Sequence, residues 1–87
     1  MDILKNILLN KKERTSFIKS FQERVWNGEE FSSDERINEI LRDLVLNLDY
    51  YEPDKILRSE SPSYYGDKRL ESEITDAIKL INRTNTR

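Results

Sequence analysis

SSDERINEILRDLVLNLDYYEPD, residues 32–54, contains the clearest helix in the sequence and the turn that ends it. Ser32 and Glu35 have the spacing of a capping box, so we expect the helix to begin there. We expect it to end by about Tyr51, because Pro53 disfavours helical geometry at Glu52. Between these limits, apolar residues recur at helical spacing and predict one buried face: Ile37, Ile40, Leu41, Leu44, Val45 and Leu48.

Two more helices are expected before this one. Asp2 can cap a short first helix, and a polar break follows at residues 10–14. Thr15 or Ser16 can cap a second helix, which should stop at Gly28 because glycine tolerates the left-handed conformation at a C-terminal cap. Apolar residues predict the buried faces of the two helices: Ile3, Leu4, Ile7 and Leu8 in the first, and Phe17, Ile18, Phe21 and Val25 in the second.

After the central helix, residues 52–66 read as a mostly irregular connection, with room for a short helical turn at 53–57. A last helix is expected to start at Gly66 or Asp67, and residues 82–87 form a polar tail that should fray. The buried face of this helix is predicted at Leu70, Ile74, Ala77, Ile78 and Ile81.

These segments predict an all-α fold in a single domain of residues 1–87. The chain has 36% hydrophobic and 37% charged residues, and only amphipathic helices hide enough apolar surface at such a composition. Four helices with mostly short connections favour an antiparallel four-helix bundle.

The sequence contains no cysteine and no histidine. Disulfides and thiolate metal sites are therefore excluded, which fits a reducing cytosol, and the commonest general base is missing. The first nine residues lack the basic start and long apolar run of a signal peptide, and no stretch approaches the ~20 apolar residues that span a membrane. We expect a cytoplasmic protein that is not an enzyme and needs no cofactor.

Charge is strongly polarised along the chain. Residues 29–67 contain eleven carboxylates and four basic residues, so this segment carries −7, whereas residues 1–28 carry +3 and residues 68–87 carry +2. Carboxylates and tyrosines crowd around one proline at residues 48–54, LDYYEPD. Anionic and aromatic groups together suit a surface that docks on a basic protein partner.

The same carboxylates offer two other interpretations. Glu52 and Asp54 could form an acid–base pair, but such a pair needs a pocket that separates their pKa values, and a loop in so small a bundle offers little burial. Asp49, Glu52 and Asp54 could also bind a hard cation, but they lack the regular spacing and the glycine of a calcium loop. Solvated carboxylates explain the pattern better than either site.

A basic patch favours nucleic-acid binding as the main alternative. Lys11, Lys12, Arg14 and Lys19 are clustered, and helix-turn-helix domains are of this size. The −7 segment would repel phosphates, so a solvated helix face is the simpler explanation of these side chains.

Two adjacent pairs of tyrosines, 50–51 and 64–65, lie at the two ends of the acidic connection after the central helix. Tyrosine is favoured in interfaces because it buries a large area at low entropy cost. We expect one member of each pair to close the end of the bundle, with Tyr50 and Tyr64 as the candidates. The other members, Tyr51 and Tyr65, would then be available to a partner.

The chain resembles the immunity proteins of the colicin D type, which include relatives from contact-dependent growth inhibition systems. Residues 3–9 resemble the first helix of that family, 17–25 its second and 70–74 its last. The most specific match is YEPD at 51–54, which resembles the aromatic-Glu-Pro-Asp turn after the third helix. The family's Asp-Arg pair after that turn is replaced here by KILR at 55–58.

The resemblance implies a small antiparallel four-helix bundle that neutralises a toxin domain cleaving transfer RNA. Carboxylates of such immunity proteins occupy the basic active-site cleft of the toxin, so the implied partner is a basic nuclease domain bound 1:1, with no direct contact to nucleic acid. By position, the implied inhibitory carboxylates are Asp49, Glu52 and Asp54. The expected contact residues are, in all, Asp49, Tyr51, Glu52, Asp54, Glu60 and Tyr65.

Two other function classes remain open at this point. A helical regulatory or nucleic-acid-binding module would use the Lys11–Lys19 face and bind nucleic acid in a salt-dependent manner. A scaffold or self-associating bundle would form a dimer without any toxin.

Overall fold

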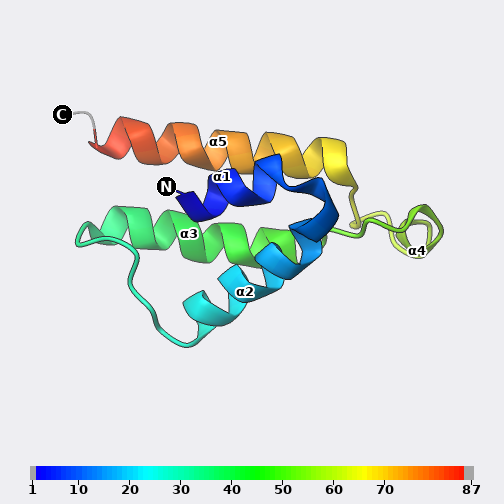
Figure 1. The fold of residues 1–87 in the computed structure, drawn as a ribbon, viewed down its shortest axis with the longest axis horizontal. Coiled ribbons are helices and arrows are strands. Elements are labelled where there is room, and N and C mark those ends of the chain that lie inside the picture. Colours follow the sequence, from blue (N-terminus) through cyan, green and yellow to red (C-terminus); the bar gives the residue numbers. More distant parts are fainter. Residues whose placement is uncertain (1, 86–87) are drawn as a thin grey trace.

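The computed structural model describes residues 2–85, which form an all-α structure without a strand (Figure 1). An isolated parallel bridge joins Tyr51 and Tyr65. The elements are α1 (Asp2–Leu9), the 3₁₀ turn η1 (Lys11–Glu13), α2 (Arg14–Trp26), α3 (Glu35–Leu48), α4 (Lys55–Arg58) and α5 (Asp67–Asn85).

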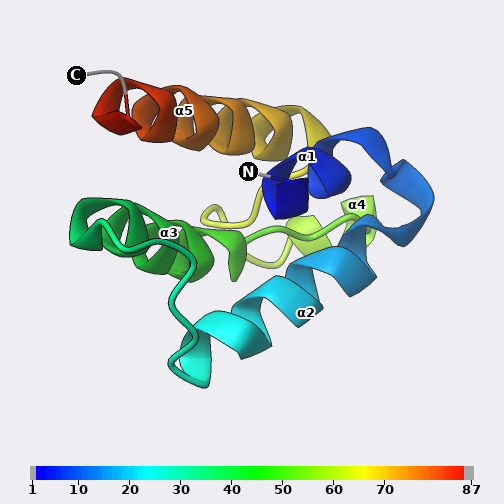
Figure 2. The same cartoon turned by 60° about the vertical axis from the view of Figure 1, so that its left-hand side comes forward.

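The four longer helices pack in a ring. α1 contacts α2 and α5, and α3 also contacts α2 and α5. Figures 1 and 2 show α3 and α5 running antiparallel, with α2 inclined across one side of α3. The connection that carries α4 extends beyond the helices at the end where α3 stops and α5 begins.

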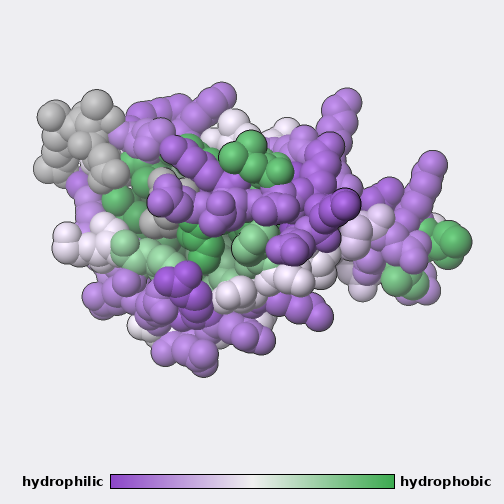
Figure 3. Space-filling model, in the orientation of Figure 1, coloured by the Kyte–Doolittle hydropathy of each residue, from purple (hydrophilic) through white to green (hydrophobic). Residues whose placement is uncertain are grey.

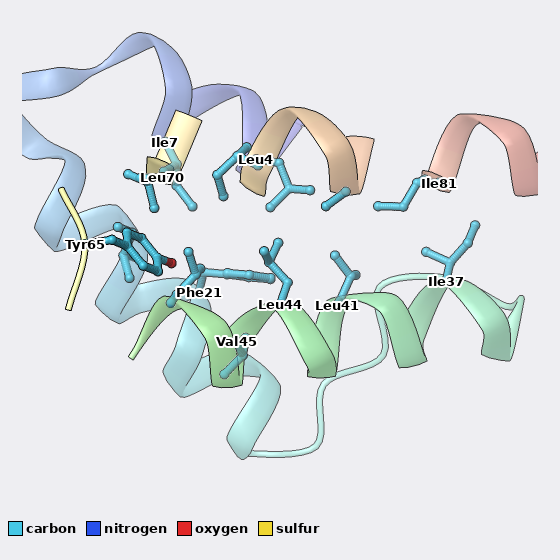
Figure 4. Close-up of a cluster of buried hydrophobic side chains, with 14 residues drawn as sticks. Leu4, Ile7, Phe21, Ile37, Leu41, Leu44, Val45, Tyr65, Leu70 and Ile81 are labelled. Atoms are coloured by element: carbon cyan, nitrogen blue, oxygen red, sulfur yellow. The ribbon is translucent and has the colours of Figure 1, made fainter. Parts of the chain in front are cut away.

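The core lies inside this ring and follows the predicted apolar faces. Figure 4 shows Leu4 and Ile7 of α1 lying beside Leu70 of α5, opposite the side chains of α3. The predicted positions are confirmed as buried, or as partly buried at Ile3, Leu8, Phe17, Val25, Ile40 and Ile78. Burial of these side chains at about 25 cal/mol per Å² of apolar area is the main stabilising term.

The start of α3 differs from the prediction. Asp34, and not Ser32, caps the helix, because its carboxylate accepts a hydrogen bond from the Arg36 N–H at 3.0 Å. The Ser32 hydroxyl instead accepts from the Asp34 N–H at 3.0 Å, and Glu35 forms an ion pair with Arg42. The prediction of a capping box is therefore wrong, although the helix begins only two or three residues after the predicted start.

The start of α2 also differs, whereas its end is confirmed. Arg14 is the first residue of α2, so Thr15 and Ser16 lie within the helix and do not cap it. At the other end, Gly28 has a φ of +85°, its N–H bonds to Val25 O, and the next N–H bonds to Arg24 O. This is a Schellman motif, in which glycine satisfies the last helical carbonyls.

The long connection and the last helix are close to the prediction. The expected short turn is present as α4, and α5 begins at Asp67. α5 continues to Asn85, so residues 82–85 are helical and not a frayed tail. The last two residues of the predicted tail, 86 and 87, lie outside the described residues.

Candidate partner-binding surface

A closed loop follows α3 and carries three of the six predicted contact residues, Glu52, Asp54 and Glu60. The Glu52 N–H donates to Tyr65 O at 2.8 Å, and the Tyr65 N–H donates to Tyr50 O at 2.9 Å. These two bonds join the beginning and the end of the loop, so residues 52–64 project from a fixed base. A loop fixed at its base loses less conformational entropy when it binds a partner.

Asp49 is tied to α2 by a buried glutamine. Gln22 Nε2 donates to Asp49 Oδ1 at 3.1 Å and to the carbonyl of Val45 at 3.2 Å. Gln22 itself is only 7% exposed, whereas Asp49 is exposed. The structure therefore gives this carboxylate a fixed position and leaves it accessible to solvent.

Glu52 and Asp54 shape the start of α4. The Asp54 carboxylate accepts from the N–H groups of Ile56 and Leu57 at 2.8 and 3.4 Å, and so caps the helix. Glu52 Oε2 accepts from the Asp54 N–H at 3.1 Å. Asp54 is exposed and Glu52 partly so, which leaves oxygen lone pairs of both carboxylates directed to solvent.

The predicted acidic residues do not form one pocket. A groove between α2 and the segment after α3 is lined by Asp49, Tyr51 and Glu52, with Lys19 from α2 in the same groove. Asp54 and Glu60 lie outside this groove, on the projecting loop. The structure therefore places the carboxylates along a surface at one end of the molecule.

The tyrosine assignment from the sequence is wrong. Tyr65 is only 8% exposed, and its hydroxyl donates a hydrogen bond of 2.5 Å to the side-chain amide oxygen of Asn47. This residue therefore closes the end of the core. Tyr51 is half-buried beside it, whereas Tyr50 and Tyr64 are 48% and 39% exposed. Tyr65 is thus a structural residue, and Tyr50 and Tyr64 are the tyrosines that a partner can reach.

The hydroxyl of Tyr51 connects the loop to α5. It donates to Asp67 Oδ1 at 2.6 Å, and this hydrogen bond, together with the nearby Arg14, lowers the pKa of Asp67. Burial and the Asp67 carboxylate raise the pKa of Tyr51 to about 12, and burial raises the pKa of Tyr65 to about 12.

Arg14 organises this end of the fold, a role that the sequence did not indicate. Its side chain is 1% exposed and donates to the carbonyls of Ile7 and Leu8 at 2.9 and 2.8 Å, at the end of α1. It also donates to Asp67 at 2.8 Å and Glu71 at 3.2 Å, on the first turns of α5. One guanidinium thus caps α1 and ties it to α5.

This arrangement weakens the basic patch as a nucleic-acid site. Arg14 is buried and paired, and Lys11 lies 3.9 Å from Glu71. Lys12 and Lys19 remain exposed, and Lys19 shares its groove with Asp49. Carboxylates on both sides oppose the approach of a phosphate to this face.

No group of three or more acidic side chains among residues 2–85 is arranged to hold a metal ion. None of the helices described is long and apolar enough to cross a membrane. Comparisons with protein-family models, with curated proteins and with solved structures find no match to this chain.

Proposed function

We propose that this chain is an immunity protein that binds the nuclease domain of a cognate toxin and covers its basic active-site cleft. The observation that carries the proposal is the acidic surface at one end of the molecule, where Asp49, Glu52 and Asp54 are held by hydrogen bonds and remain accessible. The resemblance of the YEPD turn to that of colicin D-type immunity proteins supports the same function.

The physical argument is charge complementarity. An enzyme that cleaves RNA needs lysine and arginine side chains to bind a polyanion, and carboxylates on a rigid loop can satisfy the same groups. Opposite charges also speed the encounter, to ~10⁸ M⁻¹s⁻¹ or more at low salt. Fast association protects a cell in which a catalytic toxin acts as soon as it is free.

The proposal includes the finer features that the resemblance implies. The four longer helices would form the antiparallel bundle of the family, and the protein would act as a monomer in a 1:1 complex in the bacterial cytoplasm. The RNA itself would not contact the immunity protein, because the two occupy the same cleft.

Coexpression with the nuclease toxin encoded next to the gene tests the proposal. We expect the wild-type chain to protect growth and the double variant Asp49→Asn/Asp54→Asn to protect poorly. Asparagine keeps the hydrogen bond from Gln22 and the cap of α4, so these changes remove charge and leave the loop in place. Glu39→Gln/Asp43→Asn on α3 removes the same charge away from the loop and should still protect.

Full protection by the Asp49→Asn/Asp54→Asn variant would show that the loop is not the inhibitory surface. Binding of RNA or DNA by the protein alone, weakening steeply with salt, would instead favour the nucleic-acid-binding alternative.

A further inference from the structure

The loop after α3 presents two apolar side chains to solvent. Ile56 and Leu57 of α4 are 79% and 42% exposed. Within residues 2–85, α4 packs against no other helix. Figure 3 shows the result as hydrophobic surface at the tip of the projecting segment, surrounded by hydrophilic surface.

The helix that carries them is short but strongly fixed. Asp54 caps its first turn, and at its other end the Ser59 N–H and hydroxyl both donate to Ile56 O, at 3.1 and 2.6 Å. The Glu60 N–H donates to Leu57 O at 3.1 Å. A four-residue helix without tertiary packing is marginal in water, so these caps decide its conformation.

A second set of contacts ties α4 to the base of the loop. Arg58 folds back, and its Nη1 donates to Glu52 O at 3.0 Å. Its guanidinium lies directly against Gly66, where a Cβ atom would come within 2.3 Å of Nη1. Arg58 thus faces the loop base, and Ile56 and Leu57 are left facing solvent.

The other exposed leucines of the described residues, Leu9, Leu46 and Leu80, lie on α1, α3 and α5, helices that pack against one another. Leu9 ends α1 and is 83% exposed, and Leu46 lies on the outer face of α3 at 62%. Single exposed leucines of this kind are normal on a protein surface. α4 differs because its helix contributes no packing, yet it is held by capping and arginine contacts.

We propose that Ile56 and Leu57 form an apolar anchor that enters a nonpolar pocket beside the basic cleft of the partner nuclease. This inference rests on the proposed function. Charge complementarity selects the occupant, because residues 52–60 contain three carboxylates (Glu52, Asp54 and Glu60) against two basic side chains, Lys55 and Arg58, and Arg58 is turned to the loop base. A partner that meets these carboxylates with basic groups brings its adjacent surface onto α4.

The anchor and the carboxylates begin to act at different stages of binding. Long-range attraction between charges acts before contact and sets the association rate. Apolar burial acts only after contact and slows dissociation. Because α4 is fixed before binding, little entropy is lost when its two side chains are buried.

The test measures association and dissociation rates with the purified nuclease domain of the toxin encoded next to the gene. For Ile56→Ala/Leu57→Ala we expect a Kd raised about 10- to 100-fold, almost entirely through faster dissociation. Alanine preserves helix propensity, so α4 should remain folded. The control, Leu9→Ala/Leu46→Ala, removes two exposed leucines, at 83% and 62%, from other elements and should bind as the wild type does.

The outcomes separate the two proposals. If the wild-type chain binds the nuclease and the Ile56→Ala/Leu57→Ala variant dissociates at the same rate, the anchor is refuted and the proposed function stands. If the wild-type chain does not bind the nuclease, both proposals fail. An unchanged melting temperature is also required, since a large drop would show that the two side chains stabilise the fold.

Discussion

Arg14 is the one buried charged residue among those described, and it stabilises the fold by donating hydrogen bonds to several acceptors at once. It bonds two carbonyls at the end of α1 and two carboxylates at the start of α5. Burial disfavours its charge, but hydrogen bonds to Asp67 and Glu71 outweigh this effect and raise its pKa. Its ion-pair partners are half-exposed, so the cost of burying charge falls mainly on Arg14 itself.

Arg14→Met should therefore destabilise the protein by about 2–3 kcal/mol, because hydrogen bonds to a charged group are lost at two helix ends together. Lysine cannot replace it, since a single ammonium lacks the planar fork that reaches all four acceptors. Urea unfolding monitored by circular dichroism measures the effect. Lys12→Met, at an exposed neighbouring position, is the control and should change little; an equal loss in both variants would contradict the role of Arg14.

The two inward tyrosines predict how stability responds to alkaline pH. The pKa of Tyr51 and of Tyr65 is raised from 10 to about 12 in the folded protein. Between these values the unfolded chain has lost protons that the folded chain keeps, so the free energy of unfolding should fall as pH rises from 10 to 12. Chemical unfolding at several pH values measures this slope.

Spectrophotometric titration near 295 nm gives an independent check on the tyrosines. The folded wild-type protein should show a late ionisation step near pH 12, and Tyr51→Phe/Tyr65→Phe should lack it. If the late step survives in this variant, Tyr51 and Tyr65 are not the residues whose pKa is raised.

At the scale of elements, the sequence predicted the buried faces of the helices and the end of α2, but not the caps of α2 and α3 or the long-range pairing of the tyrosines. The faces of the helices and the stop at Gly28 depend on residues close in sequence, and these were confirmed. Which tyrosine of each pair points inward depends on register, because neighbouring residues in an extended segment face opposite sides. The bridge between Tyr51 and Tyr65 sets that register, and it joins segments fourteen residues apart.

In the candidate site, too, features set by neighbouring residues were predictable and features set by distant contacts were not. The turn that ends α3 and the short helix α4 follow from Pro53 and Asp54, so the position of the acidic loop was predictable. The roles of Gln22 and Arg14 were not, because each bonds to groups on other elements that meet only in the folded chain.

The packing of Arg58 on Gly66 predicts a coupling between α4 and the base of the loop. In the wild-type chain, Gly66→Ala displaces the guanidinium and its bond to Glu52 O, which costs about 1 kcal/mol. Alanine also restricts the unfolded chain, which offsets part of that cost. In an Arg58→Ala background only the favourable term remains, so Gly66→Ala should become neutral or stabilising.

A double-mutant cycle on the free energy of unfolding should therefore give a coupling of about 1 kcal/mol between the two positions. Additive effects would indicate that Arg58 does not hold the loop.

At the scale of the whole molecule, the near-neutral net charge conceals an acidic segment, residues 29–67, with a net charge of −7 between two basic segments. Part of that segment is the outer face of α3, where Glu39 lies ten residues before Asp49, or about 15 Å along the helix. This distance exceeds the Debye length of about 8 Å at physiological salt. The α3 face can therefore steer a basic partner at low salt, while the loop acts at every salt concentration.

The association rate with the nuclease should accordingly fall with increasing salt, and two pairs of variants should separate the contributions. Glu39→Gln/Asp43→Asn should lower the rate at 10 mM salt, have little effect at 150 mM and leave dissociation unchanged, because those charges act only before contact. Asp49→Asn/Asp54→Asn should lower the association rate and also speed dissociation at both salt concentrations, because these groups touch the partner. Stopped-flow mixing at the two salt concentrations measures both rates. If the two pairs behave alike, the acidic segment acts only through its total charge and the loop has no privileged place in binding.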